Sequence, residues 1–597
     1  MVDTIVHRLS EQAKKRGDEP AHMVKRGGVW HATSWREYAA EVQTVARALI
    51  RLGFNADQRA CILGSNRPEW VIFDVAVMSV GGAPAGIYTT CSPEKVAYIL
   101  VHSEAPIALL EDRSQWEKVQ EKRDELPHLK HVVMMRGAAA IDDELVMSWE
   151  ALLALGDDPD HEHEGETLAD TLAGRTAALE PKQLATLIYT SGTTGPPKAV
   201  MLSHENLAWT ARILAQVTAM EAGGRGLSYL PLSHIAEQLA TIHGPITAGG
   251  AIYFAESMAT IAADLKDCRP TLFFGVPRIW EKFHAAIGTK LEAATGPKAA
   301  LVRWARGVAE RANELKMRGE EPSGWLALQY EAAGRTVLTK LKAAVGLDAA
   351  TTLITGAAPI SREVLEFFVS LDLVVQEIYG QSEDCGPTSF NLIGRTKIGS
   401  VGPAFPGVDV QIAEDGEIRV KGPNVFLGYF KDEAATAETL QDGWLLTGDL
   451  GRFDDRGYLF ITGRKKDIII TAGGKNITPK NIESGIKNHP LVHEAIVIGD
   501  RRKYLTALVS PDTEAVDQWK KKNDAQGAAH EIEAIHDSIW ETVQQVNGKL
   551  ARVEQIKKIA VLPRALSVED DELTPTLKVK RSKVNEHFSA LIESLYA

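Results

Sequence analysis

The chain of 597 residues has 45% hydrophobic and 24% charged side chains and a formal net charge of −13. A folded chain of this length exceeds what one hydrophobic core can organise, and its composition is that of an ordinary globular protein. The acidic balance disfavours a general nucleic-acid binder, because such a protein needs a basic face for phosphate contacts.

The cysteines and the apolar runs indicate the cellular compartment in which the protein resides. Cys61, Cys91, Cys268 and Cys385 are scattered and form no Cys-x-x-Cys pair, which favours reduced thiols over a zinc site or a disulfide framework. Residues 1–17 lack the apolar core of a signal peptide, and no apolar run reaches the roughly 18 residues of a membrane span. We therefore predict a cytoplasmic protein and leave peripheral membrane association open.

Helix and strand patterns alternate in the first part of the chain. Apolar spacing predicts a helix over residues 33–53 and a strand over 59–64, then a second helix and strand within 72–87. The alternation continues to residue 134 and is typical of an α/β fold with parallel strands. Further along, residues 303–345 are rich in Ala, Leu, Arg and Glu, which predicts long helices.

An acidic segment at residues 142–170 contains His161-Glu-His-Glu164. Two histidines beside carboxylates are able to bind a metal ion, but no other cluster of ligand residues supports such a site. A solvated surface insertion is the favoured interpretation. We predict a loop here.

A loop rich in hydroxyls and glycines follows a predicted strand at residues 184–189. It reads Thr190-Ser-Gly-Thr-Thr-Gly-Pro-Pro-Lys198 and precedes a short strand, after which Ser203 is a predicted helix N-cap. Glycines let backbone N–H groups approach an anion, and the hydroxyls and the lysine add donors and charge, so the loop predicts a phosphate cradle. It is not a Walker A loop, because two prolines separate the last glycine from Lys198.

Three further strand ends carry candidate site residues. The segment Ser228-Tyr-Leu-Pro-Leu-Ser-His234 leads from a strand into a turn, and His234 alone suits either a core or a site. The pattern of residues 352–359 predicts a strand that ends in a turn of small residues. A flat ring can lie against the backbone of such a turn. The strand at residues 374–378 ends in Tyr379-Gly-Gln-Ser-Glu383, which offers an aromatic ring for a base and a carboxylate for Mg²⁺.

The last motifs are an acid, a basic cluster, a glycine loop and a terminal lysine. Asp449 ends Asp442-Gly-Trp-Leu-Leu-Thr-Gly-Asp449, and a carboxylate accepts hydrogen bonds without donating any. Gly463-Arg-Lys-Lys-Asp467 follows, and then Gly473 and Gly474 in a loop whose backbone another group can approach closely. Near the end of the chain is Lys578, which without context reads as part of a solvated basic tail.

In this order, the motifs resemble those of the adenylate-forming enzymes, the superfamily of acyl-CoA synthetases, luciferases and peptide-synthetase adenylation domains. The resemblance covers essentially the whole chain, and residues 273–281 are similar to the long-chain acyl-CoA synthetases in particular. One position departs from the family, which usually has glycine after the loop lysine, where this chain has Ala199.

The resemblance implies a role for each motif. His234 is expected near the acyl carboxylate, Thr194 and Glu383 at Mg²⁺, Lys466 at a domain hinge and Lys578 at the catalytic centre, with Thr194, Glu383 and His234 counted as catalytic too. The residues expected to bind the nucleotide are Thr190, Ser191, Gly192, Thr193, Thr194, Gly195, Lys198, Gly356, Ala357, Ala358, Tyr379, Gly380, Gln381, Ser382, Asp449, Arg464 and Lys578. Those expected to bind CoA are Gly473, Gly474 and Lys475.

The resemblance also implies the fold and the reaction. It predicts a large N-terminal α/β domain of parallel and mixed sheets flanked by helices, residues 1–465, and a small mobile C-terminal α+β domain, residues 466–597. The expected activity is ATP-dependent activation of a long-chain fatty acid to acyl-AMP, followed by transfer to CoA with release of AMP and pyrophosphate, with Mg²⁺ as cofactor.

Two alternatives stay open. Within the adenylate-forming class, the acyl group could pass to a carrier protein instead of CoA, or the acid could be aromatic. From a different class, the chain could be a non-catalytic sensor of nucleotide or acyl-AMP. Lys578 and Glu383 argue against the sensor, because a sensor has no need of groups that act only in the chemistry.

Overall fold

The largest sheet of the computed structural model has eight strands in the order β20-β11-β10-β4-β3-β5-β6-β7. The structure describes residues 3–190, 196–473, 475–574 and 577–597. The strands from β10 to β7 are parallel, whereas β11 is antiparallel to β10 and to β20. The strands are β3 (Arg59–Leu63), β4 (Ala83–Ile87), β5 (Ile107–Leu110), β6 (His131–Met134), β7 (Val146–Ser148), β10 (Leu184–Thr190), β11 (Lys198–Ser203) and β20 (Gly428–Tyr429).

Alternating side chains of this sheet supply two hydrophobic cores. In β3, Ala60 and Ile62 join the core on one face, and Cys61 and Leu63 join the core on the other. Successive residues of a strand point to opposite faces, so a fully apolar strand is stable only when both faces are covered. The helices that flank this sheet are α2 (Trp35–Arg51), α3 (Pro68–Ser79), α4 (Pro93–Ser103), α5 (Arg113–Glu121), α6 (Trp149–Gly156), α7 (Leu168–Ala177) and α8 (His204–Val217). The predicted alternation of helices and parallel strands is confirmed.

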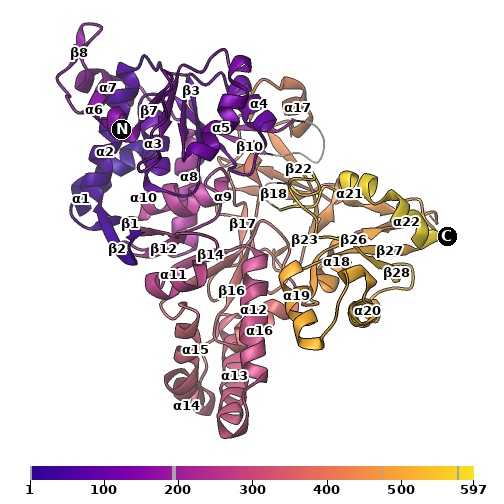
Figure 1. Cartoon of the computed structure of the whole chain (residues 1–597). Coiled ribbons are helices and arrows are strands. Elements are labelled where there is room, and N and C mark those ends of the chain that lie inside the picture. The colour runs from indigo at the N-terminus through magenta and orange to yellow at the C-terminus, as the bar shows by residue number, and fades with distance from the viewer. Residues whose placement is uncertain (1–2, 191–195, 474, 575–576) are drawn as a thin grey trace.

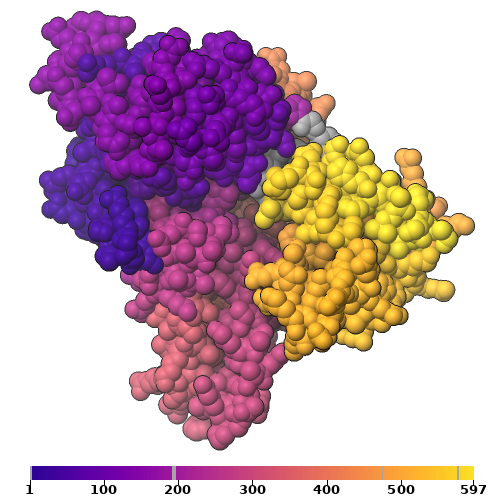
Figure 2. All heavy atoms as spheres, viewed as in Figure 1, coloured from indigo at the N-terminus to yellow at the C-terminus, as the bar shows by residue number. Residues whose placement is uncertain are grey.

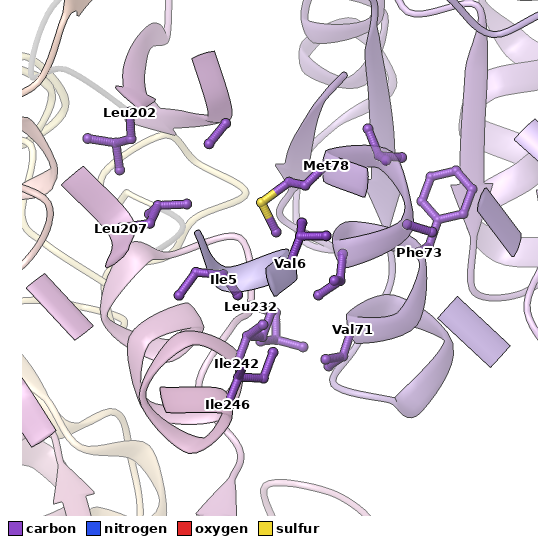
Figure 3. Close-up of a cluster of buried hydrophobic side chains, with 14 of the residues drawn as sticks. Ile5, Val6, Val71, Phe73, Met78, Leu202, Leu207, Leu232, Ile242 and Ile246 are labelled. Atoms are coloured by element: carbon purple, nitrogen blue, oxygen red, sulfur yellow. The ribbon is translucent and has the colours of Figure 1, made fainter. Parts of the chain in front are cut away.

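The larger core also joins the N-terminal helix to the segment that carries His234. Figure 3 shows Ile5 and Val6 of α1 (Ile5–Arg16) lying among side chains of α3 and of the helical run that begins after His234. That run comprises α9 (Ile235–Gln238), the π-helical turn η2 (Leu239–His243) and α10 (Gly244–Ala248). The other labelled core residues are Val71, Phe73, Met78, Leu202, Leu207, Leu232, Ile242 and Ile246.

Two four-stranded sheets lie below the eight-stranded sheet in Figure 1. The first has the order β12-β13-β1-β2, and the second has the order β14-β15-β16-β17, in which the first three strands are parallel. Their strands are β1 (Pro20–Arg26), β2 (Val29–Ser34), β12 (Arg225–Ser228), β13 (Ala251–Phe254), β14 (Leu272–Gly275), β15 (Thr352–Thr355), β16 (Val375–Tyr379) and β17 (Ser389–Phe390). The helices beside them are α11 (Ile261–Cys268), α12 (Pro277–Glu292), α13 (Gly296–Lys316), α14 (Gly324–Ala333), α15 (Thr339–Ala344) and α16 (Arg362–Ser370).

Most of the remaining strands form a five-stranded antiparallel sheet and the three-stranded sheet of the C-terminal segment. The antiparallel sheet contains β18 (Asp409–Ile412), β19 (Glu417–Lys421), β21 (Leu440–Gln441), β22 (Trp444–Phe453) and β23 (Leu459–Arg464), with α17 (Glu433–Thr439) beside it. After residue 466 come β24 (Ile469–Ile470), β25 (Asn476–Ile477), α18 (Lys480–Lys487), β26 (Val492–Ile498), β27 (Leu505–Pro511), α19 (Thr513–Asn523), α20 (Glu533–Asn547), β28 (Ile556–Val561), α21 (Arg581–His587) and α22 (Ser589–Tyr596). This segment has hydrophobic cores of its own on the two faces of β26-β27-β28.

Figure 2 shows the C-terminal segment, in orange and yellow, as a lobe packed against the rest of the chain. Among the described residues, three ion pairs cross this boundary. Lys95 Nζ lies 3.1 Å from Asp571 Oδ1, Lys549 Nζ lies 3.1 Å from Glu363 Oε1, and Arg278 pairs with Asp512. These pairs lie at the boundary across which residue 578 meets the strands described below.

The acidic segment 142–170 is not the loop that its composition predicts. It contains β7, α6 and the short hairpin β8 (Glu162–His163) and β9 (Glu166–Thr167), and it runs into α7. Trp149 and Leu152 of α6 are buried in the core that α2 shares, so burial of this apolar face outweighs the acidic composition. His163 lies in the hairpin and His161 just before it, and the described residues contain no group of three or more His, Cys, Asp and Glu arranged to hold a metal ion.

Among the residues that the structure describes, no helix is both long and apolar enough to cross a membrane. The four cysteines are all buried and free.

Candidate functional site

The carboxylate of Asp449 accepts hydrogen bonds from two other residues that are predicted to bind the nucleotide. Asp449 and Arg464 are cross-strand partners on β22 and β23, and Arg464 Nε donates to Asp449 Oδ1 at 3.2 Å. Tyr379 Oη, at the end of β16, donates to Asp449 Oδ2 at 2.9 Å. Removal from water and the nearby Asp449 charge raise the pKa of Tyr379 well above its usual value, so the phenol stays a donor.

Glu383 and Lys198 are linked through a residue that the sequence analysis missed. Tyr429 Oη donates to Glu383 Oε1 at 2.8 Å, and Lys198 Nζ lies 4.8 Å from the centroid of the Tyr429 ring. The tyrosine is in place because β20 pairs with β11, with Tyr429 opposite Val200. Nothing in the local sequence Gly428-Tyr429 signals this contact.

Lys578 reaches the same cluster from the C-terminal segment. Lys578 N donates to Thr574 Oγ1 at 3.0 Å, and Leu573 and Val579 form an antiparallel bridge. Loss of hydration and, to a lesser extent, the charge of Arg464 lower the pKa of the Lys578 ammonium to about 8. Asp449 and Glu383 act in the opposite sense. Lys578 therefore lies in the electrostatic field of three predicted site residues.

His234 is also close to Lys578. Burial lowers the pKa of His234 to about 4, and the positive charge of Lys578 contributes. Its Nδ1 accepts a hydrogen bond from Ala236 N at 3.1 Å at the N-cap of α9. A neutral imidazole that accepts at Nδ1 carries its proton on Nε2, so His234 offers a single N–H donor at its other ring nitrogen.

A buried carboxylate that the sequence analysis missed braces the turn that carries His234. Glu237 Oε1 accepts from Ser228 Oγ at 2.9 Å, Tyr229 N at 3.1 Å and Thr241 Oγ1 at 2.8 Å, and Asn66 Nδ2 lies 3.2 Å away. Burial raises the pKa of Glu237 to about 8. This network ties β12 to the helical run after His234.

The turn after β16 tolerates no side chain at Gly380. A Cβ built there would lie 1.7 Å from Gly386 O, so the two backbone segments approach too closely for alanine. Gln381 N donates to Asp384 Oδ1 at 2.7 Å, and Thr388 Oγ1 donates to Asp384 Oδ2 at 2.8 Å. Buried Asp384 thus shapes the turn that contains Ser382, although the sequence analysis assigned it no role.

The small-residue turn after β15 lies beside the end of β16. Thr355 pairs with Glu377, and a Cβ at Gly356 would meet Ile378 Cγ2 at 2.5 Å. Ala357 has a φ of +66° and is exposed, as is Ala358. An exposed backbone turn next to Tyr379 suits the approach of a flat ring.

Several predicted residues are not placed or lie apart from this cluster. Ser191, Gly192, Thr193, Thr194, Gly195 and Gly474 lie outside the described residues. The loop 191–195 is bounded by Thr190 and Lys198, which are cross-strand partners on β10 and β11. Lys466 is exposed in the short turn between β23 and β24, and Gly473 and Lys475 are exposed in the loop before β25.

A basic turn lies against the predicted CoA loop. Ala472 N donates to Arg502 O at 2.9 Å, and Arg501 N donates to Ile470 O at 2.8 Å. Arg501 and Lys503 are exposed, Arg501 Nε lies 3.8 Å from Asp500 Oδ2, and Arg502 pairs with Glu593. The run Arg501-Arg-Lys503 was visible in the sequence, but only the fold brings it beside residues 470–475.

The donor set at Glu383 fits Mg²⁺. This carboxylate uses Oε1 for the Tyr429 bond, which leaves Oε2 for a cation. Proteins bind Mg²⁺ through one or two carboxylates together with substrate phosphates, so a fuller set of protein ligands is not required.

Comparison with known proteins gives the class of the chain. Residues 9–430 match the model of the AMP-binding enzymes, and residues 466–597 match the model of the AMP-binding enzyme C-terminal domain. The chain therefore belongs to the AMP-binding enzyme family, the adenylate-forming superfamily that its motifs predict.

Similar curated proteins share a more specific name. The chain is 36% identical over 631 residues to the long-chain-fatty-acid–CoA ligase ACSBG2 of Xenopus laevis, an alignment that covers 99% of this chain and 83% of that protein. It is 35% identical over 592 residues to the long-chain-fatty-acid–CoA ligase FadD15 of Mycobacterium bovis, with coverage of 97% and 95%.

Solved structures confirm the fold. The anthranilate CoA ligase AuaEII in complex with anthranoyl-AMP has a TM-score of 0.73 at 18% identity and covers 99% of this chain and 98% of its own. The adenylation domain of a carboxylate reductase from Mycobacterium chelonae has a TM-score of 0.75 at 22% identity, with coverage of 99% and 91%.

The close approach at Gly380 gives the first prediction. Gly380→Ala should lower the free energy of unfolding by about 1–3 kcal/mol and weaken ATP binding, because the turn must move away from Gly386. Thermal denaturation and ATP titration measure the two effects. Gly174→Ala is the matched control, since that helical glycine has open space around its Cβ position. Equal behaviour of the two variants would contradict the packing argument.

Proposed function

We infer that the protein is an AMP-forming long-chain fatty acid–CoA ligase. The observation that carries this inference is the similarity to curated ligases of that name, which reaches 36% identity and extends over 99% of the chain. The alternatives, delivery to a carrier protein and a non-catalytic sensor, have no specific observation in their favour. We also propose a cytoplasmic location, supported by four buried, free cysteines.

In the first step the fatty carboxylate attacks the α-phosphorus of ATP, and pyrophosphate leaves. An anion approaches a polyanion, so the barrier is largely electrostatic. Lys578 supplies a cation that is held in place before the reaction, and the Nε2–H of neutral His234 is a donor for the incoming carboxylate. Asp449 and Arg464 hold the ribose, with Tyr379 and the turn Gly356-Ala-Ala358 against the base.

Mg²⁺, held by Glu383 together with Thr194 and the phosphates of ATP, would neutralise phosphate charge and orient the triphosphate. Tyr429 orients the Glu383 carboxylate through its hydrogen bond. Lys198 and the loop from Thr190 to Gly195, with Ser191, Gly192 and Thr193, supply the remaining donors to the phosphates.

In the second step the thiol of CoA attacks the acyl carbonyl, and AMP leaves. We propose that residues 466–597 turn about Lys466 as a small domain, so that Lys578 withdraws and Gly473, Gly474 and Lys475 come to the acyl group. The contacts Lys95–Asp571, Lys549–Glu363 and Arg278–Asp512 would break in this motion. We propose that the described orientation corresponds to the first step, because the charges of Asp449 and Glu383 act on Lys578 in it.

The phosphates of CoA need cations near the pantetheine loop. We propose that Arg501 and Lys503 supply them, since both are exposed and the backbone of their turn bonds to residues 470 and 472. Guanidinium and ammonium groups are the usual donors to phosphate oxygens.

The activity is tested by pyrophosphate release from ATP and Mg²⁺ with acids from short to very long, and with benzoate-type acids, each with and without CoA. We expect release with long acids and steady turnover to acyl-CoA only when CoA is present. Accumulation of acyl-AMP with no effect of CoA would point to a carrier protein. Absence of pyrophosphate release with every acid would refute the enzyme assignment.

The pKa of Lys578 predicts a pH dependence. The protonated ammonium form of Lys578 carries the charge that stabilises the transition state. The rate of acyl-AMP formation should therefore fall as the pH rises through about 8. Lys578→Ala should reduce that step roughly 10²–10³-fold, because it removes a charge that stabilises the transition state. Thioester formation from supplied acyl-AMP should persist in the variant.

Lys578→Arg separates charge from other causes of this pH profile. A guanidinium stays protonated at every accessible pH, so the fall near pH 8 should disappear in this variant. An unchanged profile would show that another group titrates.

The proposed role of Arg501 and Lys503 in CoA binding is tested separately. Arg501→Ala with Lys503→Ala should raise the KM for CoA on the order of 10-fold, because charge-assisted contacts to phosphate are lost, and should leave acyl-AMP formation unchanged. The double variant Lys521→Ala with Lys522→Ala, two exposed lysines of α19, is the control. Equal KM values in the two double variants would refute the role.

A further inference from the structure

Helix α4 contacts both ends of the predicted phosphate loop. Tyr98 Oη donates a hydrogen bond to Pro197 O at 3.2 Å. One turn further along the helix, His102 Nδ1 shares a hydrogen bond of 2.9 Å with Tyr189 Oη. Tyr189 and Pro197 stand on either side of residues 191–195 in the chain. Each of the two bonds therefore holds one end of the loop.

The two side chains of α4 that make these bonds also pack on each other. Tyr98 and His102 are four positions apart, which places them on the same side of the helix. Their rings are stacked, with centroids 5.4 Å apart and an angle of 16° between the ring planes. Packing of one ring on the other restricts the rotation of both, so the bonds to the two loop ends are held as a pair.

His102 also contacts the strand that carries Tyr429. The His102 ring lies edge-on to the ring of Phe430, with centroids 5.6 Å apart, and Lys431 Nζ donates to His102 O at 3.0 Å. Phe430 follows Tyr429, whose hydroxyl donates to Glu383. His102 thus contacts both an end of the phosphate loop and the strand that orients the predicted Mg²⁺ carboxylate.

Both partners in the bond between His102 and Tyr189 are neutral at pH 7. Burial and, to a lesser extent, the charge of Lys431 lower the pKa of His102. Burial raises the pKa of Tyr189, so the phenol keeps its proton. Because neither group is charged, a neutral amide is able to take the place of the imidazole in this bond.

We propose that Tyr98 and His102 are positioning residues for the phosphates of ATP, because they fix both ends of the phosphate loop relative to Glu383. The two residues act through the loop and do not contact the nucleotide themselves. A loop whose donors are already oriented binds a polyanion more tightly, since less conformational freedom is lost on binding. The identity of the ligand as ATP rests on the proposed function.

The test is calorimetric titration of the full-length protein with ATP and Mg²⁺, and separately with adenosine, in the absence of fatty acid. Tyr98→Phe removes a hydroxyl and keeps the ring, and His102→Leu removes the bond to Tyr189. Each change should weaken ATP binding roughly 3- to 10-fold, the effect of one lost hydrogen bond. Adenosine binding should stay the same, because adenosine has no phosphate to engage the loop.

A conservative variant separates the hydrogen bond from the packing of the ring. His102→Asn puts an amide near the place of Nδ1, where it can bond to the Tyr189 hydroxyl. This variant should recover most of the ATP affinity that His102→Leu loses. ATP binding by His102→Asn as weak as that by His102→Leu would overturn the assigned role of the bond.

Two matched controls remove bonds of the same kind that involve neither α4 nor the loop. Tyr458→Phe removes a hydroxyl that donates to Arg395 O at 3.1 Å. His489→Leu removes a bond of 2.9 Å to Ser538 Oγ. Both controls should bind ATP like the unmodified protein, and a loss equal to that of the α4 variants would contradict the proposal.

Two further outcomes would overturn it. One is unchanged ATP affinity in both Tyr98→Phe and His102→Leu. The other is equal weakening of ATP and adenosine binding, which indicates general damage to the site. Because the titrations need no turnover, a protein that binds ATP as expected but forms no acyl-CoA refutes only the proposed function.

Discussion

The convergence of charges around Asp449 is the constraint on which the rest of the structure depends. Its two carboxylate oxygens accept from Tyr379 and Arg464, and Lys578 lies in the same field. These groups come from β16, β22, β23 and a turn near the end of the chain, so three separate parts of the fold must be in register. A cation and an anion withdrawn from water stabilise one another only when they are held at close range.

The protonation states in this cluster follow from burial. His234 is held neutral, because its pKa is lowered to about 4, and Lys578 is poised to lose its proton near pH 8. A lysine that is partly withdrawn from water is costly to keep charged. A site in which Lys578 serves one step and then leaves avoids carrying that cost through the second step.

The contacts between the C-terminal segment and the rest of the chain suit such a motion. The Lys549 and Glu363 side chains are 75% and 56% exposed, and exposed ion pairs contribute only about 0–1 kcal/mol each. Each side of the boundary has separate hydrophobic cores. The Lys549–Glu363 contact can therefore be exchanged without unfolding either part.

Local sequence patterns determined many of the helices and strands of this protein and its superfamily. The apolar periodicities predicted α2, β3 and the parallel strands that follow, and the motif order identified the superfamily, because those patterns depend on neighbours in sequence. The tertiary structure decided the rest: that Tyr429 orients Glu383, that Glu237 and Asp384 brace their turns, and that Arg501 lies beside the loop at residue 472. It also showed that residues 142–170 fold into helices and a hairpin, since burial of Trp149 and Leu152 overrides an acidic composition. Pairing between distant strands sets such contacts, and no local pattern records it.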